Sequence, residues 1–209
     1  MSPASYRTAP PRVACATVRQ CQRLRQIEAK HQLSGPWRIL TVVSDYTIRL
    51  AGPAEYEAAG AVTLAAYAND GLIDVDTDYD KELLAAGRRA DQAELLVAVN
   101  DAGVVVGTVT FCRAGTEYAE ISRPGEAEFR MLGVAFQARG SGVGEALVRA
   151  CIERAVEYGD HALVLSTAAE MTTAHRLYER MGFRRAPGRD WRPLPTIELF
   201  AYQLDLPVR

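Results

Sequence analysis

The chain has 209 residues, of which 48% are hydrophobic and 24% charged, and its formal net charge is −2. This composition is typical of a soluble globular protein, and no apolar run approaches the roughly 20 residues that a membrane span needs. Residues 1–45 are rich in arginine, with Glu28 and Asp45 as their acidic residues, so the remaining chain is acidic. An acidic body argues against nucleic acid as partner, and the lack of a long apolar run argues against a membrane. Without the apolar core of a signal peptide we expect a cytoplasmic protein.

The predicted elements alternate between strands and helices from residue 46 onward. Residues 1–45 are interpreted as a basic N-terminal extension, partly disordered or helical, and residues 46–209 as the folded domain. The pattern predicts a strand at 46–51, a helix at 52–68, a loop at 69–80, a short helix at 80–89, a hairpin of 94–100 with 104–112, a strand at 128–135, a helix at 144–159, a strand at 161–168, a helix at 170–182 and a final strand at 196–206. This order predicts a mixed α/β domain around one sheet.

The four cysteines show no CxxC spacing, and Cys112 and Cys151 lie in apolar segments. They are interpreted as buried thiols, so we expect neither a disulfide framework nor a metal site.

Small residues gather in QARGSGVGEAL, residues 137–147, after a predicted strand and at the start of a predicted helix. Such a cluster lets backbone N–H groups surround phosphate oxygens at a helix N-terminus. A P-loop requires Lys-Ser or Lys-Thr after its last glycine, and a dinucleotide fingerprint requires GxGxxG, so neither pattern fits. The hexapeptide RGSGVG, Arg139 to Gly144, remains to be explained.

RGSGVG matches the [Q/R]-x-x-G-x-[G/A] signature of the GNAT superfamily of N-acetyltransferases. A second register, starting at Gln137, also fits, and the first is preferred because of its distance from Val134. AHRLYERMGF, residues 174–183, resembles the A-x-x-L-Y-E-x-x-G-F segment that closes the core of that family. The resemblance covers roughly residues 46–206. It implies the GNAT acyltransferase fold, an α/β fold with a central mixed and mostly antiparallel sheet flanked by helices.

The resemblance implies acetyl-CoA (coenzyme A) as the cofactor. Its pyrophosphate would be held by backbone amides of the loop, and its pantetheine arm would lie along the preceding strand. The implied cofactor-binding residues are Leu132, Gly133, Val134, Arg139, Gly140, Ser141, Gly142, Val143 and Gly144. The alternative is a simple tight turn.

Two residues are candidates for catalysis. Tyr178 occupies the tyrosine position of the second family segment, where the resemblance implies a phenol that protonates the departing thiolate. The alternative is a tyrosine that packs a helix onto the sheet. Glu128 begins the strand before the loop, where the resemblance implies, as in some members of the family, a base that deprotonates the acceptor ammonium directly or through water. Glu126 and Glu120 are rivals.

The acceptor is predicted to be a small-molecule amine. The loop between the first helices contains Asp70, Asp74, Asp76, Asp78 and Asp80, with Tyr67 and Tyr79 nearby. Carboxylates and aromatic rings attract a cation, although a solvated loop with helix-capping aspartates explains the pattern equally well. The favoured function is transfer of an acetyl group to a primary amine of a small, cationic molecule, directly within a ternary complex. A protein or peptide N-acetyltransferase and a non-catalytic coenzyme A-binding module are the alternatives, and a homodimer through the final strand is possible for this family.

Overall fold

The computed structural model describes residues 39–43, 45–72, 78–194 and 197–207. These residues belong to a unit that runs from Trp37 to Arg209. Its strands are β1 Ile39–Val43, β2 Tyr46–Leu50, β3 Glu94–Asn100, β4 Val105–Arg113, β5 Glu126–Val134, β6 Ala162–Ala168, β7 Arg184–Arg185, β8 Trp191–Leu194 and β9 Ile197–Asp205. Its helices are α2 Tyr56–Asn69, α3 Asp78–Leu84, α4 Ala86–Gln92, α5 Val143–Tyr158 and α6 Thr172–Arg180, with single 3-10 turns η1 Pro53–Glu55, η2 Phe136–Ala138 and η3 Pro187–Arg189. Within the described ranges, no helix is both long and apolar enough to cross a membrane.

All nine strands belong to one sheet, with the order β1-β2-β3-β4-β5-β6-β9-β7 and with β8 also paired to β9. The pair β5–β6 is parallel, and the other pairs of the described strands are antiparallel. The predicted fold class, an α/β fold with a mixed and mostly antiparallel sheet flanked by helices, is therefore confirmed.

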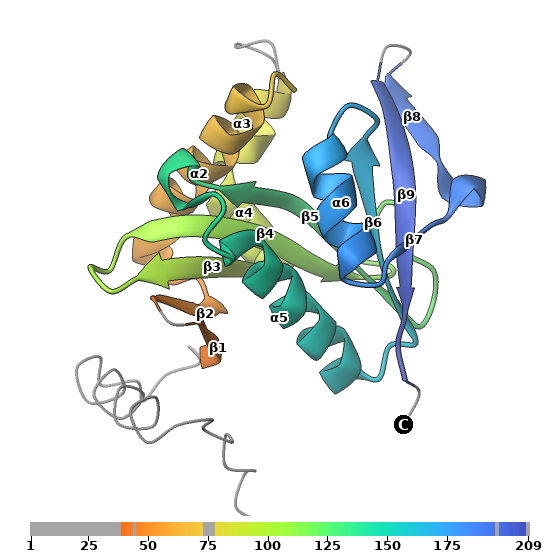
Figure 1. The fold of residues 1–209 in the computed structure, drawn as a ribbon, viewed down its shortest axis with the longest axis horizontal. Coiled ribbons are helices and arrows are strands. Elements are labelled where there is room, and N and C mark those ends of the chain that lie inside the picture. The colour runs from red at the N-terminus through yellow and green to blue at the C-terminus, as the bar shows by residue number, and fades with distance from the viewer. Residues whose placement is uncertain (1–38, 44, 73–77, 195–196, 208–209) are drawn as a thin grey trace, which may run out of the picture. The chain divides into compact units, whose positions relative to one another are not determined.

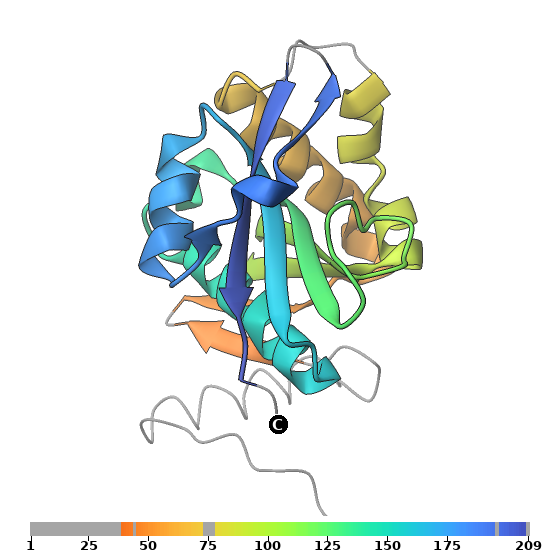
Figure 2. The ribbon, with the colours of Figure 1, turned by 90° about the vertical axis from the view of Figure 1, so that its right-hand side faces the viewer.

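Helices cover both faces of the sheet (Figures 1 and 2). On one face, the apolar stripe of α5, which includes Leu147, Val148 and Cys151, packs in a buried cluster with residues of β3 to β6 and α6. On the other face, α2 and α4 cover β3 through Ala59 and Ala86. Because β3 is covered on both faces, its sequence ELLVAVN is apolar almost throughout rather than alternating.

Strands β5 and β6 pair along only a short stretch and then part. Three residue pairs join them, and the last is Glu128 with Val164. Beyond this point β5 follows β4 while β6 follows β9, and Figure 1 shows the two strands leaving in different directions. The main-chain groups on the β6 side of residues 129–134 therefore have no partner strand in the described sheet.

Most predicted elements are confirmed, and three details differ. The single helix predicted at 80–89 is wrong: the helix ends at Leu84 and a second one, α4, begins at Ala86. The sheet also begins earlier than predicted, because β1 lies within the predicted extension 1–45 and pairs with β2. Strands β7 and β8 were not predicted. The predicted helix and disorder of residues 1–38 lie outside the described residues.

Candidate active site

The glycine-rich loop leads into the N-terminus of α5. Gly140 and Gly142 have positive φ angles of 77° and 87°, which a residue without a side chain adopts readily, and Gly142 is the N-cap of the helix. A Cβ atom added to either glycine would meet no atom within 4 Å, so the space beside this backbone is open. The first N–H groups of a helix lack partners within it. Open, unpaired N–H groups at a 16-residue helix fit a pyrophosphate.

The loop is held in place from both ends. The Ser141 hydroxyl donates a hydrogen bond of 2.6 Å to the Ala138 carbonyl, and the Ala135 N–H donates one of 2.9 Å to Val106. The buried side chain of Val143 anchors the first residue of α5 against the sheet, in contact with Gly107. The loop backbone is therefore shaped by the fold before any ligand binds.

Strand β5 contains a bulge immediately before the loop. Opposite it, Thr108 pairs with Gly133 and Thr110 with Arg130, so two residues of β5 face Val109 of β4. Met131, the first of these two, has φ +53°, a conformation that residues other than glycine rarely adopt. Such strained backbone is common at functional sites. The predicted pantetheine-binding residues Leu132, Gly133 and Val134 follow the bulge on the stretch that has no β6 partner.

Arg139 contacts the end of α2 in this structure. Its guanidinium forms an ion pair of 2.6 Å with Asp70 and donates to the carbonyls of Ala66 and Val134 at 3.2 Å and 3.4 Å. It therefore ties the loop to α2, and its predicted contact with the cofactor stays a prediction.

Tyr178 lies on α6 and is buried. Its ring contacts Phe129 of β5 at a centroid distance of 5.7 Å and Phe183 and Tyr202 at 6.0 Å. No hydrogen bond of its hydroxyl is present within the described ranges. Burial raises the pKa of Tyr178, with smaller contributions from Cys151 and Tyr202, so the phenol keeps its proton. The ring packs the helix onto the sheet, as the structural alternative proposes, and the hydroxyl can still donate a hydrogen bond.

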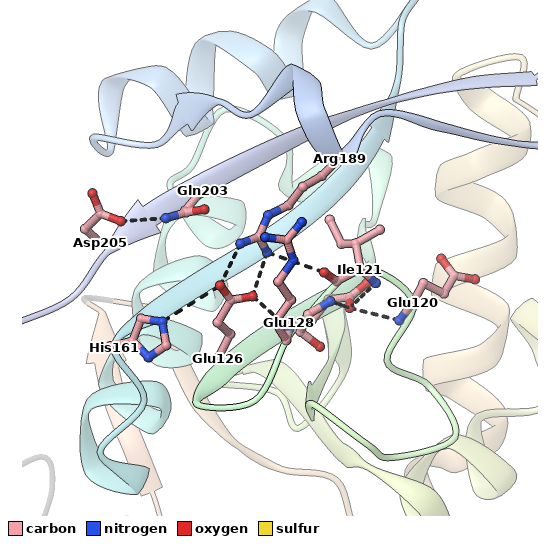
Figure 3. A network of polar contacts seen from close by, with 10 residues as sticks. Glu120, Ile121, Glu126, Glu128, His161, Arg189, Gln203 and Asp205 are labelled. Atoms are coloured by element: carbon pink, nitrogen blue, oxygen red, sulfur yellow. Dashed lines mark hydrogen bonds and ion pairs between the residues drawn. The ribbon is translucent and has the colours of Figure 1, made fainter.

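Glu128 is fully buried at the point where β5 and β6 part. Its Oε2 accepts hydrogen bonds from the backbone N–H groups of Glu120, Ile121 and Ser122 at 2.9 to 3.0 Å (Figure 3). Its Oε1 is buried and has no hydrogen-bond partner among the residues that the structure describes. A buried carboxylate oxygen without a partner calls for a water molecule or a ligand.

The two rival carboxylates differ from Glu128 in their surroundings. Glu126 is also buried, and both its oxygens accept hydrogen bonds of 2.6 Å from Arg189 (Figure 3). Glu120 is more exposed, and its Oε1 forms an ion pair of 2.6 Å with Arg130 of β5. Burial raises the pKa of Glu120, opposed by Arg130 and increased further by Glu128.

Aromatic residues of α2 and α3 complete the surroundings of Arg130. Burial raises the pKa of Tyr67. The nearby Tyr79 and Tyr178 raise this pKa further, whereas the positive charge of Arg130 lowers it. The rings of Tyr67 and Tyr79 lie 6.1 Å apart. We call Tyr67, Tyr79, Glu120 and Arg130 the Arg130 cluster. It brings together both predicted tyrosines and one rival carboxylate, and it adds Arg130, which sequence reasoning missed although a charged residue within the buried strand EFRMLGV was a signal.

The described aspartates of the predicted acidic rim have other partners or are buried. Asp70 pairs with Arg139, Asp78 with Lys81 at 2.8 Å, and Asp80 is buried in α3. Asp74 and Asp76 lie outside the described residues. The described part of the loop therefore gives little support to an acidic rim.

A hollow of about 740 Å³ lies beside η2 and the β3–β4 turn, lined by residues that include Tyr46, Asn100 and Gln137. None of the predicted catalytic residues lines it. The candidate site is defined instead by the parting of β5 and β6, with the N-terminus of α5 beyond the end of β5.

The fold and this arrangement define an acetyltransferase architecture, and comparison with known proteins identifies its family. Residues 62–183 match the Acetyltransferase (GNAT) family. The chain therefore belongs to this family, which confirms the predicted resemblance and class of enzyme. Acetyl-CoA is accordingly the expected cofactor.

Individual relatives match part of the chain. A mycothiol acetyltransferase of Pseudarthrobacter chlorophenolicus is 41% identical over 98 residues, which are 46% of this chain and 28% of the relative. The human N-acetylaspartate synthetase is 39% identical over 103 residues, which are 49% of this chain and 32% of the relative. The chain thus matches about a third of the length of these curated relatives. The yncA protein of Salmonella typhimurium, solved with acetyl-CoA, has the same fold, with a TM-score of 0.58, 24% identity and coverage of 79% of this chain and 96% of that one.

Proposed function

We propose that the chain is an acetyl-CoA-dependent N-acetyltransferase that moves an acetyl group to the primary amine of a small molecule, directly within a ternary complex. The observation that carries this proposal is the parting of β5 and β6 at Glu128. It leaves an unpaired edge of β5 that leads to the N-terminus of α5, with Tyr178 and the Arg130 cluster beside it. Acetyl-CoA supplies an activated thioester when bound.

The residues that would hold the cofactor are those of the loop and the strand before it. The N–H groups at the start of α5, around Gly142, would bind the pyrophosphate, and the unpaired backbone of Leu132 to Val134 would bind the pantetheine arm. The positive φ of Gly140 and Gly142 and the open space beside them support this assignment. Arg139 would contribute by holding the loop against α2 and by its positive charge.

Glu128 is the proposed base. The amine must lose a proton before it attacks, because an ammonium ion has no lone pair. The three N–H groups on Oε2 fix the carboxylate, and Oε1 is the atom free to take the proton, through water since the side chain is fully buried. Glu126 is less suited because both its oxygens are bonded to Arg189.

Tyr178 is the proposed proton donor to the departing thiolate. Its raised pKa keeps the hydroxyl protonated, and that proton has no acceptor among the described residues, so it is available. Backbone N–H groups at the Met131 bulge are the proposed donors to the oxygen that becomes negative during transfer.

The acceptor reaches the site with its amine protonated, as a positively charged ammonium ion that a carboxylate attracts. Glu120 is the most exposed of the three candidate carboxylates, so it is the one that can meet this charge. The names of the two curated relatives, a mycothiol acetyltransferase and an N-acetylaspartate synthetase, support a small-molecule acceptor over a protein one. A homodimer through the final strand stays a prediction, and β9 already has strands on both edges.

Calorimetric titration with acetyl-CoA tests the proposal, with two matched glycine variants. Gly142 and Gly159 cap the two ends of α5, both with positive φ and open space at the Cβ position. Leucine at either position introduces backbone strain of about 1–2 kcal/mol. We expect micromolar binding in the wild type, about −8 kcal/mol, which Gly142→Leu weakens and Gly159→Leu does not.

A second measurement separates the alternatives. Release of coenzyme A thiol in the presence of small amines identifies an enzyme. Binding of acetyl-CoA without release for any amine or peptide would favour the non-catalytic module. A folded protein that does not bind acetyl-CoA would overturn the proposal.

A further inference from the structure

An ion pair lies next to the proposed point of reaction. Arg130 follows Glu128 by two residues on β5 and precedes the bulge. Its Nη2 lies 2.6 Å from Glu120 Oε1, and its Nη1 donates a hydrogen bond of 3.0 Å to the Tyr118 carbonyl. The two side chains are 16% and 27% exposed, so the pair is partly desolvated and still reachable.

The pair adjoins both proposed catalytic residues. The backbone N–H of Glu120 donates to Glu128 Oε2, which places the ion pair beside the proposed base. On the other side, Phe129, which lies between Glu128 and Arg130 on β5, packs its ring against that of Tyr178 at a centroid distance of 5.7 Å. An acceptor bound at Glu120 and Arg130 would therefore present its amine beside the proposed base.

Neither member of the pair is saturated. A guanidinium has five N–H donors, and the described residues accept bonds from two of its nitrogens only. Glu120 Oε2 has no hydrogen bond within the described ranges. Each partner can therefore bind a further group of opposite charge.

A second guanidinium lies beneath the pair. Arg89 is fully buried and donates hydrogen bonds to the Thr63 and Thr110 hydroxyls and to the Leu83 carbonyl. No carboxylate lies within ion-pairing distance of it in the described part of the chain. Thr110 faces Arg130 across β4 and β5, so their side chains share one face of the sheet. The charge of Arg89 thus favours a negative group near Arg130.

We propose that the acceptor is an α-amino acid, or a compound whose amine is likewise one carbon from a carboxylate, with Glu120 binding its ammonium and Arg130 its carboxylate. This inference rests on the proposed function. The two charges of the zwitterion lie a short distance apart, as those of Glu120 and Arg130 do. Binding of the ligand would therefore replace the one ion pair between these side chains with two ion pairs to the ligand. A plain amine would pair with Glu120 and leave Arg130, and the buried charge behind it, uncompensated.

The test compares each of the common L-amino acids with its carboxamide, which keeps the amine and removes the negative charge. Coenzyme A release is measured at saturating acetyl-CoA. For the preferred amino acid we expect kcat/KM at least about tenfold above that of its amide. Arg130→Gln should remove this difference while leaving the affinity for acetyl-CoA unchanged.

Arg49→Gln is the matched control. Arg49 forms an ion pair with Glu55 at the same 2.6 Å, with exposures of 20% and 19%, on β2 and η1. The Arg49→Gln variant should change the melting temperature as much as Arg130→Gln does, and it should keep the preference for the carboxylate. Arg130→Lys, which keeps the charge but not the guanidinium, should restore part of the preference.

Binding of the amino acid to the complex with coenzyme A, measured by calorimetry, gives a readout without turnover. Binding of an amino acid but not its amide, lost in Arg130→Gln, supports the inference even where no acetyl group moves, a result that would count against the proposed function alone. Equal turnover of amino acids and amides, or transfer to other amines only, overturns the inference and leaves acetyl transfer standing. Absence of both turnover and binding for every amino acid overturns the inference as well.

Discussion

Glu128 is a residue whose two carboxylate oxygens have different surroundings. Oε2 anchors the loop before β5 through three backbone N–H groups, whereas Oε1 is buried and has no partner in the described part of the chain. An anchoring role needs only an oxygen acceptor, and a base needs a group that takes a proton. The two roles can be separated by one substitution.

Glu128→Gln keeps an oxygen for the three N–H groups and places an amide at the position of Oε1. We expect kcat/KM to fall by about 10²- to 10⁴-fold, the usual contribution of a general base. The free energy of unfolding should change by less than about 1 kcal/mol. Steady-state kinetics and urea denaturation measure the two effects.

The corresponding glutamine variants of the neighbouring glutamates serve as controls. Glu126→Gln should lower stability because it weakens the contact with Arg189. Glu120→Gln should raise KM for the acceptor, because Glu120 is proposed to bind its ammonium. Full kcat in Glu128→Gln would mean that the base is elsewhere.

Tyr178 combines packing with a proposed chemical role, and Tyr178→Phe separates them. The ring contacts with Phe129 and Phe183 are retained, so the melting temperature should stay the same. Loss of the hydroxyl should lower kcat by about 100-fold, the low end for an acid catalyst, because a phenol with a raised pKa is a weak proton donor.

Tyr202→Phe is the control for this variant, because Tyr202 belongs to the same aromatic cluster and its hydroxyl donates to Glu179 instead. It should retain kcat. The raised pKa also means that the wild-type rate should not fall through loss of the Tyr178 proton up to about pH 10. An unchanged kcat in Tyr178→Phe would assign the residue to packing alone.

At the scale of elements, two glycines let helices approach the sheet from opposite faces. A Cβ at Gly107 of β4 would lie 2.7 Å from Val143 Cγ1 and 3.0 Å from Leu147 Cδ1 of α5. One at Gly133 of β5 would lie 3.1 Å from Thr63 Cα of α2. Gly133 is thus explained by helix packing as well as by its predicted place on the cofactor strand.

Gly107→Ala should therefore displace the start of α5, because Val143 is its first residue. We expect a loss of about 1–3 kcal/mol in stability, the usual cost of overpacking, together with weaker binding of acetyl-CoA. Calorimetry and thermal unfolding test this expectation. Gly188→Ala is the control, since its Cβ would meet nothing within 4 Å and its φ is not positive. Unchanged cofactor affinity in Gly107→Ala would contradict the link between this contact and the loop.

The sequence was sufficient to predict the bounds of those strands and helices whose own hydrophobic pattern is strong. The strand at 94–100 was predicted with its observed bounds, and α5 was placed within one residue. The break between α3 and α4 coincides with a tertiary contact that local propensity does not contain, because the Leu84 carbonyl lies where a side chain on Gly60 of α2 would be. Strand β8 includes a proline, which argues against a strand, and it forms because β9 pairs with it.

Most candidate site residues were predicted because a local motif encodes them, and Glu128 was predicted from its place at the start of a strand. RGSGVG and Tyr178 carry recognisable patterns, so the loop and the phenol could be assigned. The ion pairs of Arg139 with Asp70 and of Arg130 with Glu120 join separate elements, and only the fold brings the members of each together. The bulge was hidden because methionine gives no signal for a positive φ.

At the scale of the whole described unit, the sheet consists of two parts that meet over a few residues. Strands β1 to β5 form one part and β6 to β9 the other, joined by the short β5–β6 pairing. Side chains reinforce this junction: Arg189 of η3 binds Glu126 at the start of β5, and His161 lies 3.9 Å from the same carboxylate (Figure 3). The junction holds the two walls of the candidate site together.

Arg189→Gln should therefore destabilise the fold in a manner that depends on pH. Burial raises the pKa of Glu126, but hydrogen bonds from Arg189 and the Arg123 N–H outweigh it and hold the pKa below its usual value. A depressed carboxyl pKa contributes stability above the unfolded value, about 4.3, and this contribution is lost as the pH falls through the folded value. At pH 7 the variant leaves Glu126 buried without its partner, which costs about 3–5 kcal/mol.

The difference between wild type and Arg189→Gln in urea denaturation should be largest above about pH 5 and shrink toward pH 3 as Glu126 is protonated. Arg192→Gln is the control from the same part of the sheet. Arg192 pairs with Glu198 at 2.9 Å with both side chains exposed, so its loss should cost at most about 1 kcal/mol. A cost for Arg189→Gln that is equally small, or that grows as the pH falls, would show that the Arg189–Glu126 pair does not hold the two parts of the sheet together.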